Sequence, residues 1–289
     1  MRIGIIGLGN MGFAMASRLI HTKHDVMGWN RSPEPLQRLV EMGGQRARSV
    51  ADVFERDVAI TMLATDEATR ATIPTDVLRK AKKGLVHIMS ATISVDYAKE
   101  LAKLHTEAGV AFLSAPVLGR PNMAAEGGLA ILAAGSRDVI DRVKPVLDTL
   151  GRRVFHVGDK PHSANVAKLA CNFALASAIQ TMSEAFVLTE RYGIATQTMA
   201  EIFTETLFAA PAYRVYAPML AQKKFEPAGF ELRLGLKDVR QAVDAGEEAG
   251  VPMSIASVLR DNFVDAMAHG DGEKDWSAVA RVAARRAGL

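Results

Sequence analysis

The stretch Arg2-Ile3-Gly4-Ile5-Ile6-Gly7-Leu8-Gly9-Asn10-Met11-Gly12 decides the fold of this chain. Its isoleucine-rich beginning predicts a short buried strand, and an Ala/Met/Leu segment predicts a helix directly afterwards, to about Ile20. Between these elements, G-x-G-x-x-G provides a tight turn at the first glycine, close backbone approach to a pyrophosphate at the second and helix–strand packing at the third. The stretch therefore predicts dinucleotide binding, with phosphates at the helix N-terminus and contacts from Gly7, Leu8, Gly9, Asn10, Met11 and Gly12.

The second predicted strand, residues 24–29, ends in Asn30-Arg31-Ser32. A site that prefers NAD usually has Asp or Glu at this strand end, where the carboxylate bonds the ribose 2′-hydroxyl. Here the position is neutral, and Arg31 follows where a 2′-phosphate would lie. Arginine binds that dianion through planar, charge-assisted hydrogen bonds, although a solvated loop arginine is the alternative. The sequence therefore predicts NADP as the cofactor, with Asn30, Arg31 and Ser32 beside it.

Apolar runs and helical segments continue to alternate as far as residue 161. Strands are predicted at 57–63, 85–89 and 110–114, followed by two short ones at 129–134 and 153–157. This βαβ rhythm indicates a parallel sheet wound on both faces. Beyond it the composition is helical throughout. The predicted fold is α/β: a Rossmann doubly wound parallel sheet over 1–161 binds NADP, and an all-α substrate and dimerisation domain covers 162–289.

Residues 162–192 contain neither Gly nor Pro, which predicts one long helix that joins the two domains. Lys168 is the only charged residue between Ser163 and Ser183, and Asn172 projects from the same helix face one turn later. Because burial disfavours a charged lysine, Lys168 either extends to the surface or lines a cleft as an acid or base. The helix alone does not decide between these interpretations. Its apolar residues cover more faces than one small domain can bury, which predicts a homodimer or a higher homo-oligomer.

The composition of the 289-residue chain excludes several other classes of protein. At 49% hydrophobic and 23% charged it is typical of globular proteins, and 35 basic residues nearly balance 32 acidic ones. No basic stripe suggests a nucleic-acid partner, and no uncharged run is longer than 169–183, which is too short to span a membrane. No histidine or cysteine spacing predicts a metal site. One cysteine excludes an intrachain disulfide and favours a cytoplasmic location, and we interpret Cys171 as a small packed residue.

Over essentially its whole length, the chain resembles the β-hydroxyacid dehydrogenase family. Six motifs occur in the family's order and spacing: Gly7–Gly12 with Met15-Ala16, Asn30-Arg31, Thr92-Ile93-Ser94, Ala115-Pro116-Val117 through Gly119, Lys168-Leu169 with Asn172, and Lys237-Asp238. Family members are oxidoreductases that act on small 3-hydroxy acids or the matching aldehydes and ketones. The resemblance implies that Lys168 is the catalytic acid–base residue and that Asn172 helps to hold the substrate. It also implies cofactor contacts from Leu63, Ala64, Thr92 and Lys237, and substrate contacts from Ser90, Leu118, Gly119, Arg120 and Lys237.

The chain departs from the family where the substrate is recognised. The family commonly has Ser-Gly-Gly where this chain has Leu118-Gly119-Arg120, so a hydroxyl is lost and a cation is gained. An aspartate usually precedes the Ala-Pro pair, and here that residue is Ser114. Asp238 either orients Lys237 or is merely its solvated neighbour. We therefore expect an altered anionic substrate, either a small hydroxy acid or a hydroxyphosphonate-like anion, at a retained chemical centre.

Two alternatives to an NADP-dependent dehydrogenase remain open. Gly119-Arg120-Pro121 is similar to a pattern in imine reductase relatives, but a cationic Lys168 would repel an iminium substrate. A cofactor-binding protein without turnover is the other alternative, and the retained Lys168, Asn172 and Lys237 argue against it.

Overall fold

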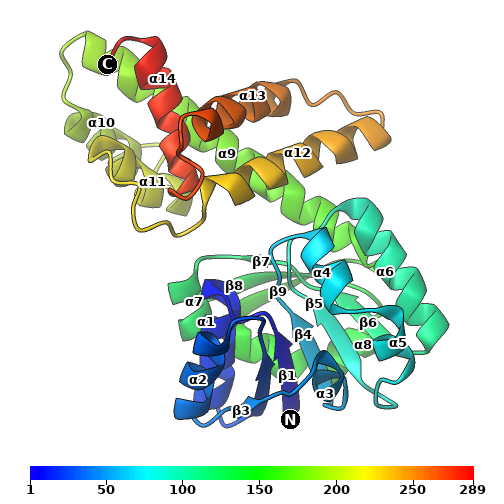
Figure 1. The fold of residues 1–289 in the computed structure, drawn as a ribbon. Coiled ribbons are helices and arrows are strands. Elements are labelled where there is room, and N and C mark those ends of the chain that lie inside the picture. Colours follow the sequence, from blue (N-terminus) through cyan, green and yellow to red (C-terminus); the bar gives the residue numbers. More distant parts are fainter. The chain divides into compact units, whose positions relative to one another are not determined.

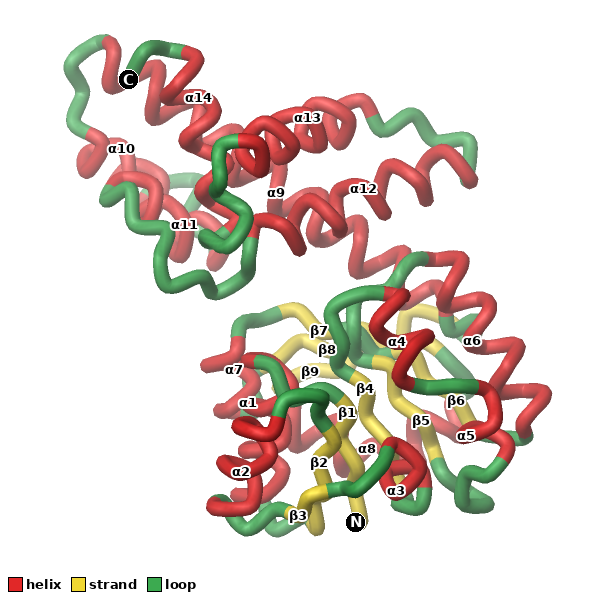
Figure 2. Tube along the Cα trace, in the orientation of Figure 1, coloured by secondary structure: helices red, strands yellow, loops and turns green.

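The computed structural model describes all residues 1–289, which divide into two compact units, Met1–Lys168 and Leu169–Leu289. The first unit contains the sheet and its covering helices, and the second is built of helices (Figures 1 and 2). The predicted domains 1–161 and 162–289 divide at the beginning of helix α9 (His162–Arg191), whereas the compact units divide inside that helix.

Six strands of the first unit form a parallel sheet in the order β3-β2-β1-β4-β5-β6, which confirms the predicted doubly wound α/β fold. These strands are β1 (Arg2–Ile6), β2 (Asp25–Trp29), β3 (Gln45–Arg46), β4 (Val58–Thr61), β5 (Val86–Met89) and β6 (Ala111–Ser114). Each longer strand of these six begins within one residue of its predicted start, whereas the later strand β9 (Gly151–Gly158) begins two residues before the predicted 153. The two-residue strand β3 carries too little apolar sequence to be recognised from its pattern.

Beyond β6 the sheet is mixed rather than parallel throughout. Strand β8 (Leu129–Ala134) runs antiparallel to both β6 and β7 (Val117–Leu118), and β9 (Gly151–Gly158) pairs parallel with β8. Between β7 and β8 the chain forms only the short helix α7 (Pro121–Glu126). A parallel crossover needs a dozen or more residues, so this connection reverses the chain direction instead.

Alternation along the strands explains why helices cover both faces of the sheet. Ile3 and Ile5 point to one face, while Ile6 points to the other. The first face packs against α1 (Asn10–His21), α2 (Pro33–Glu41), α7 and α8 (Arg137–Leu150). The second face packs against α3 (Val50–Phe54), α5 (Thr75–Arg79) and α6 (Val95–Ala108), and α4 (Asp66–Thr72) follows β4 (Figure 1).

The second unit surrounds the C-terminal part of α9 with six further helical elements. They are α10 (Thr196–Glu205), α11 (Pro211–Ala221), α12 (Leu232–Glu248), α13 (Ser254–Ala268), the 3₁₀ helix η1 (Trp276–Val279) and α14 (Ala280–Arg286). One core cluster, which includes Phe186, Phe263 and Trp276, holds them together. The bounds of α9 confirm the predicted long helix. None of the helices combines the length and the apolar character that crossing a bilayer requires.

Candidate active site

The predicted site residues of the first unit gather at one edge of the sheet. The strand register pairs Ile6 with Thr61, Thr61 with Met89, and Met89 with Ser114. The segments that leave these four strand ends are therefore neighbours, and they carry Gly7–Gly12, Leu63 with Ala64, Ser90 with Thr92, and Leu118–Arg120. The carboxyl edge is where open α/β sheets bind their ligands.

The three glycines of the first loop differ in the space around them. Gly7 has φ +92°, and a Cβ there would lie 2.2 Å from the Met62 carbonyl oxygen. A Cβ at Gly12 would lie 2.0 Å from the Gly7 oxygen, whereas a Cβ at Gly9 would meet no atom within 4 Å. Gly9 also caps α1 without a side-chain hydrogen bond. The loop thus leaves open space beside uncapped N–H groups, and these features fit a pyrophosphate.

Asn30 fastens the glycine loop to the end of β2. The Leu8 backbone N–H donates to Asn30 Oδ1 at 3.0 Å, and Asn30 Nδ2 donates to the Ser32 carbonyl oxygen at 3.1 Å. Both polar atoms of the Asn30 amide are therefore engaged within the protein. Arg31, the next residue, is exposed, as a contact with the outer part of a cofactor requires.

The predicted substrate loops have distinct local geometry. Ser90 is buried, and its backbone N–H donates to the Thr61 oxygen at 3.0 Å. Gly119 has φ +145°, and a Cβ there would lie 2.7 Å from Leu129 Cδ2, so both backbone conformation and packing select glycine. Leu118, Arg120 and Thr92 are half-buried. Their predicted contacts with ligands remain predictions.

A buried carboxylate joins two of the predicted site residues. Asn172 Nδ2 donates to Asp238 Oδ2 at 2.6 Å, and Lys237 Nζ lies 3.1 Å from Asp238 Oδ1. The Asp238 side chain is only 1% exposed, so its interpretation as a solvated neighbour of Lys237 is wrong. Lys168 is half-buried on α9, one helical turn before Asn172. Asp238 therefore orients both Lys237 and Asn172, a role that its position in the sequence left open.

Sequence reasoning missed Asn165, a fully buried residue on the first turn of α9. The Ser114 hydroxyl donates to Asn165 Oδ1 at 2.7 Å, and Asn165 Nδ2 donates to the Ile93 carbonyl oxygen at 3.3 Å. This pair gives the replacement of the family's aspartate by Ser114 a physical reason. A hydroxyl can donate to the amide oxygen, whereas an ionised carboxylate only accepts. Cys171, which we expected to be packed, is exposed.

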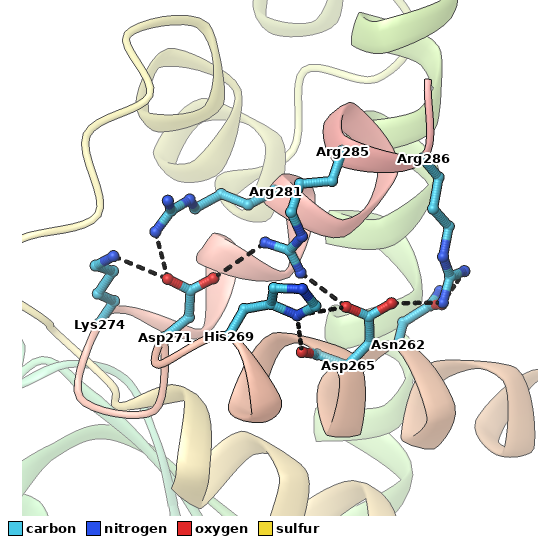
Figure 3. Close-up of polar contacts among 8 residues, drawn as sticks. All are labelled: Asn262, Asp265, His269, Asp271, Lys274, Arg281, Arg285 and Arg286. Carbon is cyan, nitrogen blue, oxygen red and sulfur yellow. Dashed lines mark hydrogen bonds and ion pairs between the residues drawn. The ribbon is translucent and has the colours of Figure 1, made fainter. Parts of the chain in front are cut away.

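The largest ion-pair network lies elsewhere in the second unit (Figure 3). Asp271 pairs with Lys274, Arg281 and Arg285, while Asp265 pairs with Arg285 and Arg286. These contacts fasten α14 to α13 and to the loop that follows α13.

Cavities of about 490 Å³ and 440 Å³ beside α14 are lined by residues of the second unit, none of which was predicted to belong to the active site. No group of three or more His, Cys, Asp or Glu side chains is arranged to hold a metal ion.

Comparisons with known proteins cover almost the whole chain. Residues 2–158 match the family model for the NAD binding domain of 6-phosphogluconate dehydrogenase, and residues 163–283 match the model for NAD-binding of NADP-dependent 3-hydroxyisobutyrate dehydrogenase. YfjR of Bacillus subtilis (strain 168), an uncharacterized oxidoreductase, is 38% identical over 96% of this chain and 98% of its own. Glyoxylate/succinic semialdehyde reductase 1 of Arabidopsis thaliana is 30% identical over 96% of this chain and 97% of its own.

Solved structures also match almost the whole chain. Mycobacterium tuberculosis 3-hydroxyisobutyrate dehydrogenase, solved with L-serine, is 32% identical and superposes with a TM-score of 0.86 over 96% of this chain and 97% of its own. An imine reductase from Myxococcus stipitatus in complex with NADP+ is 19% identical, with a TM-score of 0.68 over 98% of this chain and 99% of its own. At that identity the likeness to the imine reductase is one of fold alone.

Proposed function

We propose that this chain, which belongs to the β-hydroxyacid dehydrogenase family of NAD(P)-binding oxidoreductases, interconverts a small anionic hydroxy compound and its aldehyde or ketone with NADP(H). The observation that carries the proposal is the buried Asp238 carboxylate, which accepts a hydrogen bond from Asn172 and forms an ion pair with Lys237, with Lys168 one turn before Asn172 on α9. A buried carboxylate that holds an amide and an ammonium in fixed positions provides hydrogen-bond donors for an anionic, oxygen-bearing substrate.

The residues of the first unit fit NADP. Gly9 leaves room for the pyrophosphate, and the uncapped N-terminus of α1 offers backbone N–H groups to it. At the end of β2 the chain has no carboxylate for a ribose 2′-hydroxyl and instead presents the exposed Arg31. In this proposal Arg31 binds the 2′-phosphate, while Leu63, Ala64, Thr92 and Lys237 contact other parts of the cofactor.

Lys168 acts as the general acid in reduction. When bound, NADPH supplies the hydride that joins the carbonyl carbon. The Lys168 ammonium donates its Nζ proton to the carbonyl oxygen, so the product is the hydroxy compound and the lysine is left neutral. In the oxidative direction the neutral amine takes the hydroxyl proton back. Asn172 and Lys237, held by Asp238, orient the substrate by donating hydrogen bonds to its oxygens.

The proposed substrate is a small hydroxy acid, or a hydroxyphosphonate-like anion, with its carbonyl counterpart. The names of the Arabidopsis and Mycobacterium relatives support small oxo and hydroxy acids. Leu118 and Arg120 replace a hydroxyl and a glycine of the family pattern, and a guanidinium suits a larger or more highly charged anionic group. Ser90 and Gly119 are proposed to complete the pocket for that group.

Lys168→Met tests this proposal because it keeps the length of the side chain and removes the exchangeable proton. NADPH consumption is measured on a panel of small oxo acids, semialdehydes and oxophosphonates, with NADPH binding measured separately. We expect turnover on the best substrate to fall by about 10²–10⁴-fold while NADPH still binds. Lys144→Met, which removes an exposed lysine on α8, is the matched control and should keep wild-type turnover.

Two outcomes would contradict this assignment. A Lys168→Met variant with more than about a tenth of wild-type turnover would show that another group donates the proton. No NADPH consumption by the wild-type protein on any compound of the panel would favour a cofactor-binding protein without turnover.

We also propose that the chain forms a homodimer or a higher homo-oligomer through its helical unit. Apolar side chains are exposed on several of its helices, among them Leu188 on α9, Ile202 on α10 and Ile255 on α13. Exposed apolar surface of this kind is commonly covered by a second subunit. Sedimentation equilibrium at micromolar concentration measures the mass, and a monomer would contradict the proposal.

A further inference from the structure

The first turn of α9 carries a buried amide that connects three separate segments. Asn165 is 0% exposed and bonds Ser114, the last residue of β6, together with the carbonyl oxygen of Ile93. Ile93 directly follows Thr92 in the segment after β5, and Ser114 begins the segment that leads to Leu118. One side chain therefore fixes α9 against two of the strand-end segments that carry the predicted site residues.

The direction of the two hydrogen bonds is determined by their chemistry. A backbone carbonyl only accepts, so the group that faces Ile93 must be Nδ2 and the group that faces Ser114 must be Oδ1. Ser114 is also 0% exposed, so its hydroxyl can offer its proton to that oxygen without competition from water. The arrangement leaves both polar groups of the Asn165 amide with a partner in the interior.

We propose that Asn165, through its bonds to Ser114 and Ile93, is a positioning residue that sets the rotation of α9 and thereby the position of Lys168. The inference rests on the role of Lys168 proposed above. Lys168 lies three residues after Asn165 on the same side of the helix. At about 6 Å from the helix axis, a rotation of roughly 10° displaces an atom by about 1 Å. A misplacement of that size can lower turnover by about 100-fold.

Ser114→Ala tests the proposal because it removes one hydrogen-bond donor without substituting Lys168 or any residue of the cofactor loop. We expect kcat to fall by about 10- to 100-fold, with little change in the KM for NADPH. Ser114→Cys keeps the shape of the side chain with a slightly larger atom and retains a weak donor, so its kcat should lie between those of wild type and Ser114→Ala. It also replaces Ser114→Ala if that variant does not fold. Unchanged kcat in both variants would overturn the proposal.

Ser277→Ala is the matched control for the loss of a buried hydroxyl. Ser277 is also 0% exposed, and its Oγ donates to Asp275 Oδ1 at 2.7 Å in the second unit. We expect Ser277→Ala to lower thermal stability about as much as Ser114→Ala while kcat stays at the wild-type value. If both variants lower kcat equally, the effect of Ser114 is one of general stability and the proposal fails.

The combination with Lys168→Met shows whether Ser114 acts through the lysine. In a Lys168→Met background, Ser114→Ala should lower kcat by less than about twofold further, because the group that it positions is already absent. The same factor in both backgrounds would overturn the positioning role while leaving the acid–base role intact. A Lys168→Met variant that keeps its turnover would instead contradict the proposed function itself, so the two failures are distinguishable.

Discussion

The two units bury their ionisable side chains in opposite ways. The first unit buries His87 and His105 but no carboxylate, and its one buried charge, Arg56, pairs with Asp25 at 2.9 Å. The second unit buries three carboxylates, Asp238, Asp271 and Asp275, and surrounds each with cations or hydrogen-bond donors. The first interior therefore holds mainly a pair of histidines, and the second holds carboxylates surrounded by cations and hydrogen-bond donors.

The hydrogen bonds of the histidine pair all run in one direction, from donor to acceptor. His105 Nδ1 lies 2.7 Å from the Leu101 carbonyl oxygen, so that nitrogen carries the proton and Nε2 must accept. His87 Nδ1 then donates to His105 Nε2 at 2.7 Å, and the Thr61 hydroxyl donates to His87 Nε2 at 2.8 Å. A further proton on His105 Nε2 would place it face to face with the N–H donor of His87 Nδ1. This difference between the units leads to predictions of unequal size.

The largest effect is expected from Asp275→Ala in the second unit. Asp275 is 0% exposed and accepts from the backbone N–H groups of Gly229, Phe230 and Ser277 and from the Ser277 hydroxyl. Removing the carboxylate leaves these donors without their acceptor, which should lower the free energy of unfolding by about 3–5 kcal/mol. Urea unfolding measures this loss.

Asp261→Ala is the control for Asp275→Ala, because Asp261 is an exposed aspartate on α13 that pairs with Arg260. Its effect should stay below about 1 kcal/mol. A loss of less than about 1 kcal/mol for Asp275→Ala as well would contradict the view that buried carboxylates hold this unit together.

The next largest effect concerns acid and the first unit. Burial lowers the pKa of His105 to about 4, although its bond to the Leu101 carbonyl opposes the shift. Burial first, and then the neighbouring His105, hold the pKa of His87 well below its ordinary value of 6.5. Because these pKa values are lower in the folded state, the unfolded chain binds more protons below pH 6.5. Stability is therefore complete above that pH and falls toward pH 4, with a loss of about 3 kcal/mol from His105 alone.

The free energy of unfolding between pH 6.5 and 5 checks this prediction, since most carboxylates remain ionised in that window. The double variant His87→Leu/His105→Leu should flatten the slope, because both partners become apolar together. His21→Gln, at the exposed end of α1, is the control and should leave the slope as it is. An equal slope in wild type and double variant would show that the pair does not govern the acid response.

The features that sequence reasoning could predict depend on contiguous residues. The strand–glycine loop–helix order, the alternation of strands and the bounds of α9 follow from local patterns and local sterics. Contacts between distant residues could not be predicted: Asn172 and Asp238 are 66 residues apart, and Ser114 and Asn165 are 51 apart. The rotation of α9 about its axis, which decides which of its residues are buried, could not be predicted either. Cys171 is exposed and Asn172 is buried, although both follow similar apolar residues.

A smaller effect, confined to binding, is expected from Arg31→Ala. Arg31 is exposed, so its charge contributes little to folding and is available for a ligand. Loss of charge-assisted hydrogen bonds to a 2′-phosphate should weaken NADP binding by about 10- to 150-fold, or about 1.5–3 kcal/mol. Titration with NADP and with NAD should show the loss for NADP only. Arg137→Ala, at an exposed arginine on α8, is the control, and equal losses for both cofactors would contradict the assignment.

The smallest effect is expected from a substitution in the glycine loop of the first unit. A Cβ at Gly9 would meet no atom within 4 Å, so Gly9→Ala should fold with a stability within about 1 kcal/mol of wild type. That Cβ would occupy the space left for a pyrophosphate, and NADPH affinity should fall by about 10-fold, or about 1.4 kcal/mol. A Cβ at Gly12 would lie 2.0 Å from the Gly7 oxygen, so Gly12→Ala, unlike Gly9→Ala, should lower the free energy of unfolding. Unchanged NADPH affinity in Gly9→Ala would place the pyrophosphate elsewhere, because a methyl group that contacts no protein atom can only lower affinity by contact with the ligand.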